Sequence, residues 1–258
     1  MQILTLQFDL PLHPGDLSGF RAAIAELVGL EHEYFHNHKN NIDPSQHHWS
    51  YPLIQYQVRR GKAQIMAMGK GRDAIYQYLL PKLPTTLAFA NQTHRLGKFR
   101  FFEQEYNWAI SAQPFTYGLV HWLALNSNNY TNWQKTDSEK TRQVILNKAI
   151  TGHLRAFAER IGIPSTDIIH GSVLQVDRIK KMTWHKQSFV GFNALIQSNL
   201  ALPSGPGLGR CVAFGFGELL SERQYQQSAF HRKRNDRKQL ISRSNQTIFA
   251  NEKIIKNI

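Results

Sequence analysis

Strand-type and helix-type hydrophobic periodicities alternate along the first part of this chain, and their order restricts the fold. Residues 2–10 alternate between apolar and polar side chains, which is the period of a strand with one buried face. Residues 17–28 then carry apolar side chains at helical spacing. The runs 49–59 and 62–68 flank Arg60-Gly61, so together they predict a β-hairpin.

Helical spacing returns over residues 71–80 and is ended by Pro81. Residues 86–108 are rich in β-forming and aromatic side chains, which predicts one or two strands. The resulting order β-α-β-β-α-β is that of the ferredoxin-like, or RRM-like, unit. We therefore predict a ferredoxin-like N-terminal domain over residues 1–110.

A second round of the same order is predicted over residues 111–220. It consists of a strand at 115–125, a long helix at 138–161, one long strand or two short ones at 167–184, a helical or mixed segment at 189–200 and a last strand at 208–220. The chain is thus expected to have an α+β fold with two tandem ferredoxin-like domains. Residues 221–258 hold nine Lys or Arg against three Asp or Glu, which predicts a flexible basic tail.

The charge of the chain indicates the class of its partner. With 31 Lys and Arg against 18 Asp and Glu, the formal net charge is +13 at pH 7. This favours a polyanion, and nucleic acid is the first candidate. No apolar run approaches the ~18 residues of a membrane helix, so no membrane partner is expected. The single cysteine, Cys211, excludes an internal disulfide framework and fits a reducing, cytoplasmic compartment.

Spaced glycines recur near the end of the second predicted domain, within PSGPGLGRCVAFGFG (residues 203–217, here called the glycine loop). Gly207, Gly209, Gly215 and Gly217 form G-x-G twice, without the third glycine of a dinucleotide fingerprint or the Lys of a P-loop. Backbone without Cβ atoms can approach a phosphate closely, and Arg210 adds positive charge. The loop is therefore predicted to bind RNA, with a tight turn before a strand as the alternative.

The doubled ferredoxin-like order ending in GLGRCVAFGFG resembles the RAMP superfamily of CRISPR-associated RNA-binding proteins. Within it, the segments YFHNHKN, WSYPLIQYQVRRGKAQIMAMGKG and GFNALIQSNLALPSGPGLGRCVAFGFG resemble a bacterial branch of the Cas-six endoribonucleases. The resemblance implies an enzyme of the hydrolase class that cuts CRISPR precursor RNA within its repeats to make mature guide RNA. It implies no metal and no other cofactor. Membership of a CRISPR effector complex and formation of a homodimer stay open.

Two other functions compete with this interpretation. A non-catalytic RAMP subunit would hold guide RNA in a CRISPR effector complex and cut nothing. Such a scaffold would not need the histidine cluster described next. A general basic RNA-binding protein outside CRISPR systems would explain the charge but not the glycine spacing.

Residues 31–51 contain five of the twelve histidines of the chain. In the resembled family, a metal-independent active site lies in this region. A histidine there deprotonates the ribose 2′-OH, which attacks the neighbouring phosphorus and leaves 2′,3′-cyclic phosphate and 5′-OH ends. Histidine suits this step because it is the side chain whose ordinary pKa lies closest to 7.

His36, His38 and Lys39 are the predicted catalytic residues. They can supply a general base, a general acid and a cation that stabilises the phosphorane. In an extended segment, His36 and His38 would point the same way. Two alternatives stay open: the base is His47, His48 or a tyrosine, or His36 and His38 bind zinc together with His47 or Asp43.

Basic residues on two predicted strands are the remaining RNA-binding candidates. Lys98 and Arg100 alternate along one strand, and Arg178 and Lys180, with Lys181 adjacent, along another. Basic side chains on one face of a strand could follow an RNA backbone. The alternative for each of them is an ordinary solvated strand face.

Overall fold

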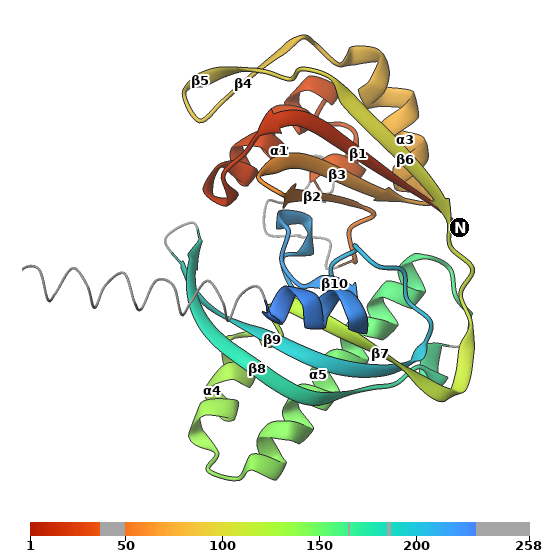
Figure 1. Cartoon of the computed structure of the whole chain (residues 1–258), viewed down its shortest axis with the longest axis vertical. Helices are drawn as coiled ribbons and strands as arrows, with labels where there is room; N and C mark the ends of the chain where they lie inside the picture. The colour runs from red at the N-terminus through yellow and green to blue at the C-terminus, as the bar shows by residue number, and fades with distance from the viewer. Residues whose placement is uncertain (37–49, 165, 185–186, 231–258) are drawn as a thin grey trace, which may run out of the picture.

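The computed structural model describes residues 1–36, 50–164, 166–184 and 187–230 of the chain (Figure 1). The N-terminal half contains, in chain order, β1 (Gln2–Pro11), η1 (Pro14–Asp16), α1 (Leu17–Val28), α2 (Glu33–His36), β2 (Ile54–Arg59), β3 (Lys62–Met68), α3 (Lys70–Ala74), η2 (Ile75–Leu79), η3 (Leu80–Lys82), β4 (Thr86–Phe89), β5 (Gln92–Arg95) and β6 (Phe99–Glu105). The C-terminal half contains β7 (Ile110–Trp122), α4 (Ser127–Lys135), α5 (Glu139–Arg160), η4 (Thr166–Ile168), β8 (Gly171–Trp184), β9 (Gln187–Leu200), η5 (Val212–Phe214) and β10 (Glu218–Ser221). Residues 222–230 are also helical.

The N-terminal sheet has the strand order β2-β3-β1-β6, with antiparallel neighbours throughout. The alternation of β1 buries Leu6 and Phe8 in one cluster with Phe20 of α1, which confirms the predicted strand and helix. The predicted hairpin is also confirmed, with a two-residue turn between β2 and β3. Arg60 (φ 51°) and Gly61 (φ 73°) both take the left-handed conformation that a type I′ turn requires.

The C-terminal sheet has the order β10-β7-β9-β8, again with antiparallel neighbours. Numbered within each half, the strands of both sheets follow the same ferredoxin-like order, 4-1-3-2. The predicted long helix is α5, and its Leu154 and Phe157 share a buried cluster with Trp122 and Phe192 of the sheet. The α+β fold with tandem ferredoxin-like units is therefore confirmed.

Two predictions for the second unit are wrong. The segment 189–200, expected to be helical or mixed, lies in β9, a central strand whose residues are mostly buried on both faces. Burial on both faces removes the polar alternation by which a strand is recognised. The last strand spans only Glu218–Ser221 instead of 208–220, because Gly209, Gly215 and Gly217 take positive φ values that end a strand. Between β9 and β10, where a ferredoxin-like unit has its second helix, this unit has the glycine loop with η5.

Two details of the first unit also differ from prediction. Residues 86–108 form three strands, because Ala90 (φ 50°) and Asn91 (φ 59°) reverse the chain between β4 and β5 before β6 begins. The predicted helix at 71–80 changes type along its length, from α3 through the π-helical η2 to the 3₁₀ turn η3 that contains Pro81. Neither change alters the order of the sheet.

The two sheets face each other (Figure 1). Helices α1 and α3 cover the outer face of the N-terminal sheet, α4 and α5 cover that of the C-terminal sheet, and η5 lies between the sheets. Ile3, Met66 and Met68 of the first sheet share one buried cluster with Trp122 and Leu208 of the second half. The halves therefore pack through a common hydrophobic core. Within the described ranges, no helix is long and apolar enough to cross a membrane.

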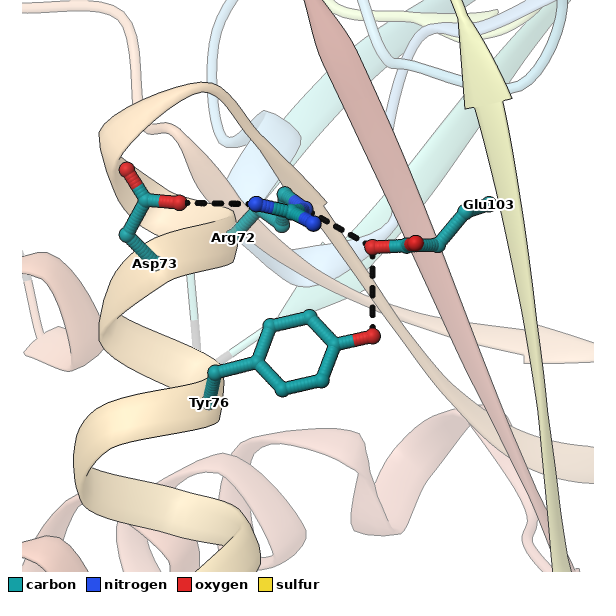
Figure 2. A network of polar contacts seen from close by, with 4 residues as sticks. All are labelled: Arg72, Asp73, Tyr76 and Glu103. Carbon is teal, nitrogen blue, oxygen red and sulfur yellow. Dashed lines mark hydrogen bonds and ion pairs between the residues drawn. The ribbon is translucent and has the colours of Figure 1, made fainter.

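A polar network ties β6 to the outer layer of the N-terminal half (Figure 2). Arg72 Nε donates to Glu103 Oε1 at 2.7 Å, and the hydroxyl of Tyr76 donates to the same oxygen at 3.1 Å. The Arg72 guanidinium lowers the pKa of the Glu103 carboxyl below its usual value. Because side chains alternate along a strand, this places Arg100 and Phe102 on the opposite face, which looks toward the C-terminal half.

Candidate active site and nucleic-acid interface

The glycine loop is bound to the N-terminal sheet by side chains of β2 and of the segment before it. Gly207 N–H donates to Gln55 Oε1 at 2.8 Å, and the Tyr51 hydroxyl donates to the carbonyl of Gly207 at 2.8 Å. Gln57 Nε2 donates to the carbonyl of Gly205 at 2.8 Å. Gln55 and Gln57 are buried, so these polar side chains are satisfied by the loop backbone instead of by water.

The same loop is bound to the end of β7 in the C-terminal sheet. Gly217 N–H donates to the carbonyl of His121 at 3.1 Å, and Arg210 N–H donates to that of Leu123 at 3.2 Å. Arg210 Nη1 donates to the carbonyl of Leu125 at 3.0 Å. The loop is therefore a hydrogen-bonded joint between the two sheets.

Close packing in this joint accounts for several of the glycines. A Cβ atom on Gly217 would lie 1.9 Å from the Leu208 carbonyl oxygen, and one on Gly207 would lie 2.5 Å from that of Phe216. Gly207 and Gly217 are buried and their N–H groups donate within the protein. Packing within the glycine loop is thus sufficient to explain both. RNA contact by the half-buried Gly209, Arg210 and Gly215 stays a prediction.

A half-buried histidine of α5 binds the end of β7, next to the joint. Trp122 Nε1 donates to His153 Nδ1 at 3.2 Å. Burial and, to a lesser extent, the nearby positive charge of Arg210 lower the pKa of His153 to about 4. His153 is therefore neutral near pH 7 and acts as a hydrogen-bond acceptor for Trp122.

Of the three predicted catalytic residues, His36 is the one that lies within the described part of the chain. It ends α2 and is half-buried, with its Nε2 2.6 Å from the carbonyl oxygen of Leu30. A carbonyl oxygen can only accept, so Nε2 carries a proton and Nδ1 is the acceptor nitrogen of the neutral ring. A histidine held in this tautomer can accept a proton at Nδ1, as a general base must. His38 and Lys39 fall within residues 37–49, outside the described residues.

The histidine-rich stretch 31–51 (here called the histidine segment) is attached to the glycine loop through its described residues on either side of 37–49. On one side, the Arg21 guanidinium donates to the carbonyl of His36 and stacks on the Phe214 ring, with Cζ 4.5 Å from the ring centroid. On the other side, Tyr51 binds the carbonyl of Gly207. His36 and Tyr51, on either side of residues 37–49, are therefore both attached to the joint between the sheets. The sequence did not single out Arg21, which belongs to no motif, and it assigned no separate role to Tyr51, which lies in the quoted segment WSYPLIQYQVRRGKAQIMAMGKG.

Two buried tyrosines near the histidine segment act as hydrogen-bond donors. The hydroxyl of Tyr56 donates to the carbonyl of Phe35 at 3.2 Å, and that of Tyr51 binds Gly207. Burial raises the pKa of both phenols well above the usual value for tyrosine. Both hydroxyls therefore stay protonated near pH 7 and position backbone rather than accept a proton.

The basic strand residues are exposed, and the structure separates them by face. Arg178 pairs with Asn193 and Lys180 with Gly191, whereas Lys181 pairs with Val190. Phe192 packs with the α5 layer, so alternation puts Asn193 and Gly191, with their partners, on the face toward the N-terminal half. Lys181 lies on the other face.

Lys98 and Arg100 lie on or beside the edge strand β6. Arg100 pairs with Gln7 of β1, and Lys98 precedes the strand with its carbonyl bound by Asp9 N–H at 2.8 Å. Lys62 forms an ion pair with Asp9, and this pairing lowers the pKa of the exposed Asp9 carboxyl. The structure thus gathers these cations on the face toward the C-terminal half, although they share it with one carboxylate.

Two protein-family models match consecutive parts of the chain. The Cas6b N-terminal domain matches residues 1–106, and the Cas6b C-terminal domain matches residues 109–222. The chain belongs to the Cas6b family. This confirms the resemblance to the Cas-six proteins that the sequence motifs indicated.

Solved structures with the same fold include Cas6 proteins. This Cas6b chain is similar to a crystal structure of Cas6b with a TM-score of 0.73 and 20% identity, over 86% of this chain and 100% of that one. It is also similar to a structure described as the CRISPR RNA processing endoribonuclease Cas6b, with a TM-score of 0.63 and 17% identity, over 85% and 99%. A curated relative, an uncharacterized protein of Methanocaldococcus jannaschii, is 26% identical over 100 residues. That match covers 38% of this chain and 66% of the relative.

Proposed function

We propose that this Cas6b protein cuts CRISPR precursor RNA within its repeats and produces mature guide RNA. In this proposal, a ribose 2′-OH attacks the adjacent phosphorus, and the products carry 2′,3′-cyclic phosphate and 5′-OH ends. No metal ion takes part. The repeat RNA is the partner, and the reaction takes place in the cytoplasm.

The observation that carries the proposal is the attachment of the histidine segment to the glycine loop at both of its ends. His36 thus lies beside a joint whose flanking sheets carry exposed Arg100, Arg178 and Lys180 on their facing sides. An RNA strand held by these cations would pass the histidine segment.

Each proposed catalytic residue has one task. His36 accepts a proton at Nδ1, since its Nε2 is bound to the Leu30 carbonyl, and His38 is its partner in proton transfer. Lys39 stabilises the extra negative charge of the phosphorane.

Cleavage of a repeat RNA in excess EDTA tests the proposed function. We expect the single-turnover rate to change less than about twofold on chelation, since side chains rather than a metal handle the protons and the charge. Mass spectrometry of the upstream product should give a 2′,3′-cyclic phosphate.

Loss of cleavage in EDTA, or a 3′-OH product, would contradict the proposed chemistry. Absence of cleavage of any repeat RNA that the protein binds would favour a non-catalytic RNA-binding subunit instead.

A further inference from the structure

His121 has a backbone conformation that its surroundings must enforce. Its φ is 52°, a left-handed value that is uncommon in residues other than Gly, although His, like Asn and Asp, adopts it more often than most residues do. Among the described residues, the other non-glycine positions with positive φ lie in turns or in the glycine loop, whereas His121 lies inside β7. The register of β7 against β9 shifts between Leu119 and Trp122, so His121 belongs to a β-bulge.

Two hydrogen bonds fix this bulge. His121 N–H donates to Oδ1 of the buried Asn193 at 2.9 Å, and its carbonyl accepts from Gly217 N–H of the glycine loop at 3.1 Å. Neither bond uses the imidazole ring, so a residue that tolerates positive φ more easily would satisfy the backbone equally well.

The bulge brings His121 to the face of the C-terminal sheet that looks toward the N-terminal half. Gly191 of the neighbouring strand β9 would point a side chain to this face. A Cβ atom added to Gly191 would lie 3.6 Å from His121 Cα, so the bulged backbone at His121 lies above this face. Asn193, which binds His121 N–H, is the next residue of β9 on that face. His121 is exposed there.

The two residues of β9 that lie beside His121 are the register partners of basic residues. Asn193 pairs with Arg178, and Gly191 pairs with Lys180. Cross-strand partners share a face, so Arg178, Lys180 and His121 lie together on one side of the sheet, and all three are exposed. Two permanent cations and an imidazole suit a phosphodiester backbone, in keeping with the formal charge of +13 for the whole chain.

We propose that His121 is an RNA-binding residue, presented by the bulge so that its imidazole and the side chains of Arg178 and Lys180 contact phosphates of one RNA strand. The inference rests on the proposed function, because it takes the repeat RNA as the ligand. A role in RNA binding would explain why a residue with a strained backbone is kept at this position. It also joins the contact to the glycine loop, since the Gly217 bond holds the bulge in place.

The test compares RNA binding with thermal stability in matched variants. His121→Asn and His121→Gly accept positive φ, so both should unfold at or above the wild-type temperature while binding a labelled repeat RNA about tenfold more weakly at 0.1 M salt. Lys180→Gln should lower the slope of log Kd against log salt by about 0.7–1. Lys181→Gln removes the same charge one residue away, on the other face, and should bind like wild type.

Wild-type affinity in both His121 variants would overturn the proposal, as would an equal loss of affinity in Lys180→Gln and Lys181→Gln. If both His121 variants unfold at lower temperature than wild type, the histidine stabilises the bulge and the binding role is rejected. Wild-type protein that does not bind repeat RNA would contradict the proposed function instead. If the wild-type protein binds and cuts the repeat RNA and the His121 variants bind it equally well, only this inference is contradicted and the proposed function stands.

Discussion

At least one of the variants His36→Ala and His38→Ala is expected to cut repeat RNA about 10²-fold more slowly than wild type, or slower still, in single-turnover experiments. The reason is that a general acid or base typically contributes a factor of this size to proton transfer. Affinity for the repeat should stay about normal in both variants, because the exposed Arg100, Arg178 and Lys180 are still present to bind its phosphates. Rates measured with enzyme in excess separate the chemical step from product release.

His32→Ala is the matched control. This histidine lies in the same segment but stacks on Tyr78, with ring centroids 3.8 Å apart, and it should cut at close to the wild-type rate. If both His36→Ala and His38→Ala cut normally, the base is another residue, such as His47, His48 or a tyrosine. The family assignment would then stand and the residue assignment would be wrong.

Gly217→Ala is expected to destabilise the protein by about 3 kcal/mol, because it combines a left-handed backbone with a steric clash. The φ of Gly217 is 69°, and an added Cβ would lie 1.9 Å from the Leu208 carbonyl oxygen. For a chain of this size, such a loss lowers the unfolding temperature by roughly 6–12 °C. Thermal unfolding followed by circular dichroism measures it.

Gly152→Ala is the control for adding a methyl group to a glycine. Gly152 lies in α5 with nothing within 4 Å of its added Cβ, so this change should stabilise the helix by about 0.5–1 kcal/mol. A Gly217→Ala protein that keeps wild-type stability but loses RNA affinity would assign this glycine to phosphate contact. The packing explanation would then be wrong.

The N-terminal half could be predicted well because each of its elements follows one simple periodicity. Residues 2–10 have one buried face, and Arg60-Gly61 supports the turn that joins β2 and β3. In the second half, β9 was not predicted as a strand, because both of its faces are covered and its sequence therefore lacks the alternation of apolar and polar residues. Its buried Asn193 and Ser198 also interrupt the apolar pattern without making the strand amphipathic.

The candidate site was predictable where residue type alone indicates chemistry, as for His36 and the exposed Arg178 and Lys180. The residues that hold the site in place could not be predicted, because they act through hydrogen bonds to residues far away in the sequence. Gln55 and Tyr51 look like ordinary polar and aromatic residues until the glycine loop, about 150 residues later in the sequence, supplies their partners (a sequence separation of 152 for Gln55 and Gly207). The strain at His121 likewise has no sequence signal, since a positive φ inside a strand is imposed by its neighbours.

The central claim is that the RNA supplies its own nucleophile. Its most direct test replaces the ribose just 5′ of the cut by deoxyribose in an otherwise unchanged repeat RNA. The account predicts that the protein binds this RNA with unchanged affinity and does not cut it, because the attacking 2′ oxygen alone is missing. Cleavage of the deoxyribose substrate at the same position, at a rate near that of the all-ribose repeat, would contradict the account.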